Sequence, residues 1–268
     1  MSATTAPTTI DPQVTATSTP VPEQHPLALS VLLHLFPGVA LTVFVLLLAP
    51  VLAPYGVPAP FVLFLGIPLV IVPLELGYLL WHAKRTTGSF RLRAAIDYRE
   101  RYPARKVAVW SAGLVAWFLV FFTASTVLLD DWLAATFFAW LPDAILAFST
   151  FEDGGVEPTR LVMIGLVVIA FVFNGVVGPV TEELYFRGHL LPRIERLGRW
   201  APVFNTVLFS LYHLWTPWQN PARIVGFLPI AWVAQRKRSV QVAIAAHVTV
   251  NLLFLVGLFA AIAAGVAA

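Results

Sequence analysis

The chain has 268 residues, of which 59% are hydrophobic and 12% are charged, and its formal net charge is +3. A soluble globular domain carries about 45–50% apolar and roughly 25% charged residues, so this composition excludes a soluble protein and indicates an integral membrane protein. The chain contains no cysteine, which excludes disulfides, thiolate zinc sites and cysteine nucleophiles.

The N-terminal residues 1–26 predict a disordered tail. They are rich in Ser, Thr, Pro and Ala, and their only charged side chains are those of Asp11 and Glu23. A secretory signal needs a basic start and then a short apolar core, and this stretch has neither. The apolar runs that follow recur without a soluble insert, so we expect a tail and then one integral membrane domain, 27–268.

A helix that crosses the hydrocarbon of a bilayer needs about 20 mainly apolar residues. The predicted spans are 27–53, 57–81, 107–129, 161–191, 201–215, 222–234 and 239–264. The fifth and sixth are short. The aromatic stretch from Trp132 to Leu141 is too short to cross, and we expect it to lie at the interface or to re-enter. The predicted fold class is an all-α polytopic membrane helix bundle with about seven transmembrane helices, or about eight if that stretch crosses.

The charges in the loops predict an orientation, because basic residues in short loops mark the cytoplasmic side. Lys and Arg cluster in the loops after the second, fourth and sixth spans. The loop after the third span instead carries Asp130, Asp131, Asp143, Glu152, Asp153 and Glu157. All four loops agree on a cytoplasmic N-terminus, and the Ala-, Val- and Arg-rich composition favours a prokaryotic plasma membrane.

Polar residues recur at helical spacing in three of the later apolar segments. The three motifs are Glu182-Glu183-x-x-x-Arg187, Phe209-x-x-x-His213 and His247-x-x-x-Asn251. Residues four apart lie on one helical face, so Glu183 can reach Arg187 while Glu182 points elsewhere. His247 can neighbour Asn251 for the same reason. Ionisable residues within a membrane span are expensive, which makes them candidates for function.

The depths of these side chains in the membrane are expected to be similar. With a rise of ~1.5 Å per residue, Glu182 lies roughly 15 Å from the expected cytoplasmic end of its helix, at Pro192. The same calculation places His247 at roughly 12 Å and His213 at roughly 21 Å. These depths overlap within the uncertainty of the helix ends, so we expect the three groups to converge in a cavity that water can enter.

Two mechanisms suit these residues, and their spacing leaves both open. In the first, Glu182 is a general base, His213 orients or shares the proton, and His247 and Asn251 donate hydrogen bonds to an oxyanion. In the second, Glu182, His213 and His247 hold a divalent metal such as Zn²⁺, which lowers the pKa of a bound water.

The same residues also have structural interpretations. A His or Asn in a membrane helix is often an interhelical hydrogen-bond donor. The spacing of Glu183 and Arg187 predicts a structural pair that fixes the helix presenting Glu182. Phe209 is expected to serve in packing between helices. If all these residues serve as helix contacts, the chain is a membrane scaffold or an immunity protein. A proton-relay transporter is a third class, which the lack of an internal repeat disfavours.

Taken together, the three motifs resemble those of the CAAX protease and bacteriocin-processing family of intramembrane endopeptidases, also called Abi or Ras-converting-enzyme-type proteases. The resemblance covers residues 163–254. It implies an all-helical membrane fold in which Glu182 and His213 activate water. It also implies that His247 and Asn251 stabilise the oxyanion, with Glu183 and Arg187 in support. Family members are commonly labelled metalloproteases, although a metal-free glutamate mechanism has been argued for the type.

The resemblance also implies partners. Eukaryotic members remove the last three residues of prenylated CAAX proteins, and other members are linked to bacteriocin maturation or self-immunity. A prokaryotic source disfavours a prenylated CAAX substrate here. We expect a membrane-embedded or lipidated peptide substrate entering from the bilayer, and no nucleic acid. The motifs of site-two, rhomboid and presenilin-type proteases are absent from the sequence.

Overall fold

The computed structural model describes residues 22–146 and 159–264, and these form a bundle of helices. The α-helices are α1 (Leu27–Leu52), α2 (Ala59–Gly66), α3 (Val72–Thr87), α4 (Ala104–Ser125), α5 (Asp131–Phe137), α6 (Asp143–Leu146), α7 (Arg160–Ile169), α8 (Gly178–Glu182), α9 (Ala201–Leu211), α10 (Asn220–Lys237) and α11 (Gln241–Ala263). The predicted all-α fold is confirmed. Residues 1–21, most of the predicted tail, lie outside the described residues.

Short segments of 3₁₀- and π-helix join these helices. They are η1 (Ala53–Tyr55), η2 (Ile67–Ile71), η3 (Leu92–Ala94), η4 (Thr126–Asp130), η6 (Ala170–Val177), η7 (Glu183–Leu190), η8 (Leu191–Trp200) and η9 (Pro217–Gln219). Both η6 and η7 are π-helical. The depth expected for Glu182 assumed a regular α-helix, whereas the structure places this residue at the junction of α8 with η7. Short π-helical segments occur frequently at functional sites.

Five helical stretches of the described residues are long and apolar enough to cross a membrane. They are Leu27–Tyr55, Ala59–Thr87, Ala104–Phe137, Arg160–Leu211 and Gln241–Ala263. The fourth stretch covers the predicted fourth span and most of the predicted fifth, and the backbone is kinked between them at Gly198. The predicted sixth span lies within α10, which carries Arg223, Arg236 and Lys237 and is not among the five. The chain is an integral membrane protein, and a total of seven or eight crossing helices stays a prediction.

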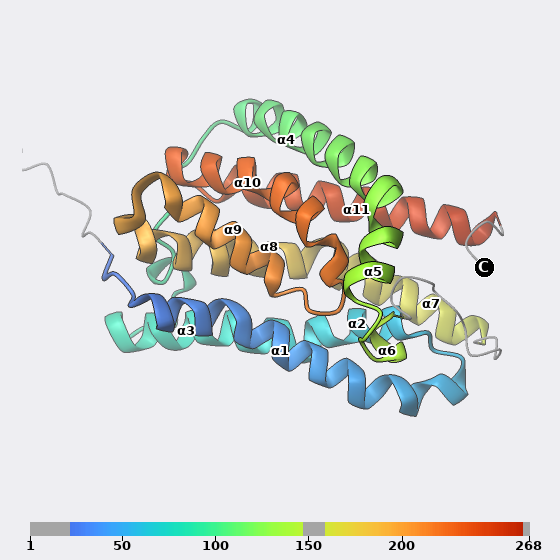
Figure 1. Ribbon diagram of the computed structural model, residues 1–268. Helices are drawn as coiled ribbons and strands as arrows, with labels where there is room; N and C mark the ends of the chain where they lie inside the picture. The colour runs from blue at the N-terminus through green and yellow to red at the C-terminus, as the bar shows by residue number, and fades with distance from the viewer. Residues whose placement is uncertain (1–21, 147–158, 265–268) are drawn as a thin grey trace, which may run out of the picture.

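The helices pack in layers that enclose α8 and α9 (Figure 1). On one side, α4 packs against α10 and α11, and these two helices contact α9 and α8. On the other side, α1 contacts α9 and α3 contacts α8. The outer faces of α1, α4 and α7 expose large apolar side chains, including Leu47, Val120 and Leu161. The polar segments α8 and η7 are therefore held inside a bundle whose outer surface suits lipid.

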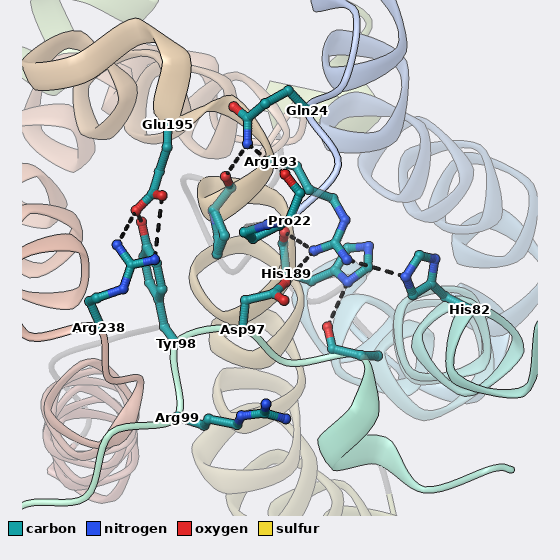
Figure 2. A network of polar contacts seen from close by, with 12 residues as sticks. Pro22, Gln24, His82, Asp97, Tyr98, Arg99, His189, Arg193, Glu195 and Arg238 are labelled. Atoms are coloured by element: carbon teal, nitrogen blue, oxygen red, sulfur yellow. Dashed lines mark hydrogen bonds and ion pairs between the residues drawn. The ribbon is translucent and has the colours of Figure 1, made fainter. Parts of the chain in front are cut away.

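The loop between α3 and α4 is fastened to η8, which is also bonded to the residue that follows α10 (Figure 2). Arg193 forms an ion pair with Asp97 at 2.5 Å. The Tyr98 hydroxyl donates to Glu195, which also accepts from Arg238 at 2.8 Å. These contacts fix the loop against the segment that follows the Glu182-Glu183 motif.

The residues just before α1 also contact η8. The Gln24 side chain donates to the carbonyl of Pro192 at 2.9 Å, and the His25 amide donates to the carbonyl of Arg193 at 2.8 Å. Burial, together with the nearby Arg193 cation, lowers the pKa of His25 to about 4. His25 is therefore neutral at physiological pH and adds no charge beside Arg193.

A close approach between α1 and the end of α9 positions Tyr212. Gly38 lies on α1 where an added Cβ would meet the carbonyl oxygen and the ring of Tyr212. Tyr212 is fully buried and packs against Phe186 and Phe209. Only a residue without a side chain fits at this contact.

Replacing Gly38 with alanine is expected to destabilise the protein. Overpacking of this kind costs about 1–3 kcal/mol, because the backbone of Tyr212 must move. Gly77→Ala is the matched control, since a Cβ at Gly77 meets nothing within 4 Å. Thermal unfolding in detergent measures both variants. Equal midpoints for the two would show that α1 and Tyr212 are not in close contact.

Candidate active site

Side chains from each of the three motifs line one cavity of about 250 Å³. Glu182 comes from the end of α8, His213 from the turn after α9, and His247 with Asn251 from α11. The structure thus brings together the groups whose convergence the sequence predicts. Asn174 of η6, Tyr212 and Arg223 line the same cavity, and aromatic rings including Phe118 and Phe227 form its apolar wall.

Glu182 faces this cavity and keeps 13% of its side chain exposed. The Tyr212 hydroxyl donates a hydrogen bond to Oε1 of Glu182 at 3.1 Å. The second oxygen, Oε2, lies 3.8 Å from Nε2 of His247. One carboxylate oxygen is therefore held by a phenol while the other is directed toward an imidazole.

Glu183 points away from the cavity and is fully buried, as is Arg187. Its Oε1 lies 3.2 Å from Nη1 of Arg187 and 2.9 Å from Nδ1 of His247. The predicted pairing of Glu183 with Arg187 is confirmed. The Arg187 guanidinium also lies 4.0 Å from the centroid of the Phe209 ring, so the phenylalanine of the second motif supplies a cation–π contact to the first.

The contacts of His213 define which ring nitrogen is free. Nδ1 lies 2.8 Å from the carbonyl oxygen of Phe209. A carbonyl only accepts hydrogen bonds, so Nδ1 carries the proton and Nε2 of the neutral ring is an acceptor. His213 makes no ion pair with Glu182 or Glu183 in the described part of the chain. The rings of Tyr212 and Trp215 flank the imidazole.

Asn251 completes the cavity on α11. Its side-chain amide donates to the carbonyl oxygen of Asn174 in η6 at 2.8 Å. This contact joins α11 to the segment that precedes Glu182. The amide group retains one N–H and its carbonyl oxygen for other partners.

Glu182, His213 and His247 are residue types that bind a divalent metal ion, but the distances between them do not form a metal site. His213 and His247 each engage Nδ1 and leave Nε2 for other partners, an arrangement common in metal-binding histidines. However, no group of three or more His, Asp or Glu side chains among residues 22–146 and 159–264 is placed to hold a metal ion.

Three residues of the site were not found from the sequence. Tyr212 precedes His213 and reads as an ordinary apolar-face aromatic residue. Arg223 lies in the first turn of α10, and it falls within the predicted sixth span, 222–234, without a predicted role. Glu75 on α3 is fully buried, and its electrostatic neighbours include Glu182 and Glu183. A carboxylate within the second predicted span was a usable signal for Glu75.

Removing the charge of Glu183 is expected to destabilise the fold. Glu183→Gln leaves Arg187 as an uncompensated buried cation, and breaking such a pair costs about 3–5 kcal/mol. The double variant Glu183→Leu with Arg187→Met removes both charges and is expected to recover most of this loss. Thermal or denaturant unfolding in detergent measures both. A single variant as stable as the wild type would show that the ion pair is not a structural element.

Residues 164–253 match the family model described as "Type II CAAX prenyl endopeptidase Rce1-like". The matched region contains all three motifs and coincides with the segment in which the sequence resemblance was found. Comparisons with curated proteins and with solved structures gave no match.

Proposed function

We propose that this chain, an integral membrane protein whose residues 164–253 belong to the Rce1-like type II CAAX prenyl endopeptidase family, is an intramembrane endopeptidase. It hydrolyses a peptide bond of a membrane-associated or lipidated substrate. The observation that carries this proposal is the shared cavity of Glu182, His213, His247 and Asn251, which come from three separate parts of the chain.

The first step is the activation of water by Glu182. Tyr212 donates to Oε1, which leaves Oε2 to take a proton from the water. Nε2 of His213 accepts a second hydrogen bond from the same water, because Nδ1–H is already engaged with Phe209. The water oxygen then attacks the carbonyl carbon of the substrate, and a tetrahedral intermediate forms.

The second step is stabilisation of the oxyanion by His247 and Asn251. Nδ1–H of His247 donates to Glu183, so Nε2 can donate to an oxyanion only in the imidazolium form. The carboxylate of Glu183 balances that charge, since Glu182 carries the proton taken from water at this stage. The free N–H of Asn251 is the second donor. The proton held by Glu182 then passes to the leaving amine as the carbon–nitrogen bond breaks.

The surroundings of the cavity support an apolar or lipidated substrate. A second, apolar pocket of about 490 Å³ is lined mainly by α11 and shares Asn174 and Phe254 with the catalytic cavity. An apolar chain attached to the substrate can lie there while the peptide bond reaches Glu182. A prokaryotic plasma membrane and a cytoplasmic N-terminus remain part of this proposal.

A non-catalytic scaffold or immunity protein is the second candidate function. It is favoured by the hydrogen bonds that His247 and Asn251 make to neighbouring segments, because such contacts are typical helix-to-helix bonds in membranes. The two functions differ in a single property, which is turnover of a peptide.

Proteolysis by purified protein in liposomes tests the proposal. Glu182→Ala and His213→Ala are each expected to lower the rate by about 10²–10⁴-fold, the usual contribution of a positioned acid–base group. Membrane-spanning and lipidated peptides are expected to be cleaved faster than a soluble casein-like protein. Glu100→Ala is the control, since this carboxylate is exposed and lies outside the cavity.

Full activity in both cavity variants would contradict the proposed site, and absence of any cleavage by the wild type would favour the scaffold. A chelator added to the same assay distinguishes the two mechanisms. Loss of activity that returns with Zn²⁺ would assign Glu182, His213 and His247 as metal ligands, and unchanged activity is the result expected of the water mechanism.

A further inference from the structure

Arg223 is a buried cation in the wall of the catalytic cavity. It lies in the first turn of α10, its residue is 5% exposed, and it lines the same cavity as Glu182, His213 and His247. The mechanism described above does not use it.

The hydrogen-bond partners of Arg223 are all neutral. Nη1 donates to Oδ1 of Asn220 at 3.1 Å and, at 3.5 Å, to the carbonyl oxygen of Ser210. Nη2 donates to Oγ1 of Thr216 at 2.8 Å and to Oε1 of Gln219 at 3.3 Å. Its Nε–H makes no hydrogen bond to any of the described residues. The guanidinium is held in a fixed orientation without being neutralised.

The other two buried arginines differ in this respect. Within the described ranges, Arg187 has Glu183 and Arg193 has Asp97, whereas Arg223 has no ion pair. The Gln219 amide lies between Arg223 and the Asp130 carboxylate, because it donates to Asp130 at 3.2 Å and accepts from Arg223. Glu182, in the same cavity, accepts from Tyr212 and lies 3.8 Å from His247.

The position of Arg223 on its helix is also unfavourable. The N-terminal turn of a helix carries a partial positive charge, so a cation there is repelled and an anion is attracted. The first turn of α10 contains no acidic residue. An unpaired buried charge is strongly destabilising by itself, and the two positive contributions together form a site for an anion.

We propose that Arg223 binds a carboxylate of the substrate inside the catalytic cavity. This inference rests on the proposed function and specifies its substrates further. The one N–H that remains free, Nε–H, donates to the carboxylate, and the opposite charges of the two groups strengthen this hydrogen bond. Arg223 and His213 line the same cavity, so the bound carboxylate lies near the scissile bond. The carboxylate is either the C-terminus of the substrate or an acidic side chain close to the cleavage site.

Three peptides of one apolar sequence distinguish these sources. The first has a free C-terminal carboxylate, the second a C-terminal amide, and the third a C-terminal amide with one glutamate near the cleavage site. Wild type is expected to cleave one of the two carboxylate-bearing peptides about ten- to a hundred-fold faster than the plain amide, as the loss of a hydrogen bond to a charged group implies. The preferred peptide identifies the source.

Variants of Arg223 assign this preference to the residue. Arg223→Gln is expected to bring the ratio of carboxylate to amide cleavage close to one, and Arg223→Lys to retain part of it. Arg236→Gln is the matched control, because Arg236 is an exposed cation of the same helix and lies outside the cavity. If Arg223→Gln does not fold, Arg223→Lys, which keeps the positive charge, makes the assignment: a ratio below that of the wild type supports the role of Arg223, and an unchanged ratio contradicts it.

Fluorescence anisotropy measures the binding of the same peptides to the Glu182→Ala variant. This measurement separates the proposed role of Arg223 from the proposed endopeptidase activity. Tighter binding of a carboxylate peptide than of the amide supports the role of Arg223, even if no peptide is cleaved and the endopeptidase proposal fails. Cleavage or binding of all three peptides with equal efficiency would overturn the role of Arg223 and leave the endopeptidase proposal in place.

Discussion

The site depends on a charge cluster that water does not reach. The Glu183 carboxylate lies between the Arg187 guanidinium and the His247 imidazole, and the three residues are almost completely buried. With little solvent to screen them, displacement of any one group leaves the others uncompensated. This constraint fixes the end of α8 and the middle of α11 relative to each other. The same constraint sets the direction of the Glu182 side chain. Glu182 and Glu183 are adjacent on the helix, so a backbone that directs Glu183 away from the cavity directs Glu182 into it.

The sequence allowed much of this arrangement to be predicted. The spacing of Glu183 and Arg187 indicated an ion pair, and the structure has it at 3.2 Å. The depths of Glu182, His213 and His247 indicated convergence, and the three side chains line one cavity. These predictions succeeded because polar residues are rare in apolar helices, so each has few places in which it can be satisfied.

Other features depend on contacts between distant parts of the chain. Tyr212 is placed on Glu182 by the close approach of α1 at Gly38, which no local pattern encodes. The neutral surroundings of Arg223 become apparent only after the turn before α10 has folded around it. The π-helical segments are also set by packing, because hydropathy reports the length of an apolar run but not the type of helix that it forms.

Isotope labelling tests the central claim that the cavity directs water at a peptide bond. Purified protein in liposomes is incubated with a membrane peptide in H₂¹⁸O, and the products are identified by mass spectrometry. The account predicts that each new C-terminus carries one ¹⁸O from solvent, and that Glu182→Ala forms this product far more slowly. A labelled product formed at the same rate by the wild type and by Glu182→Ala would contradict it.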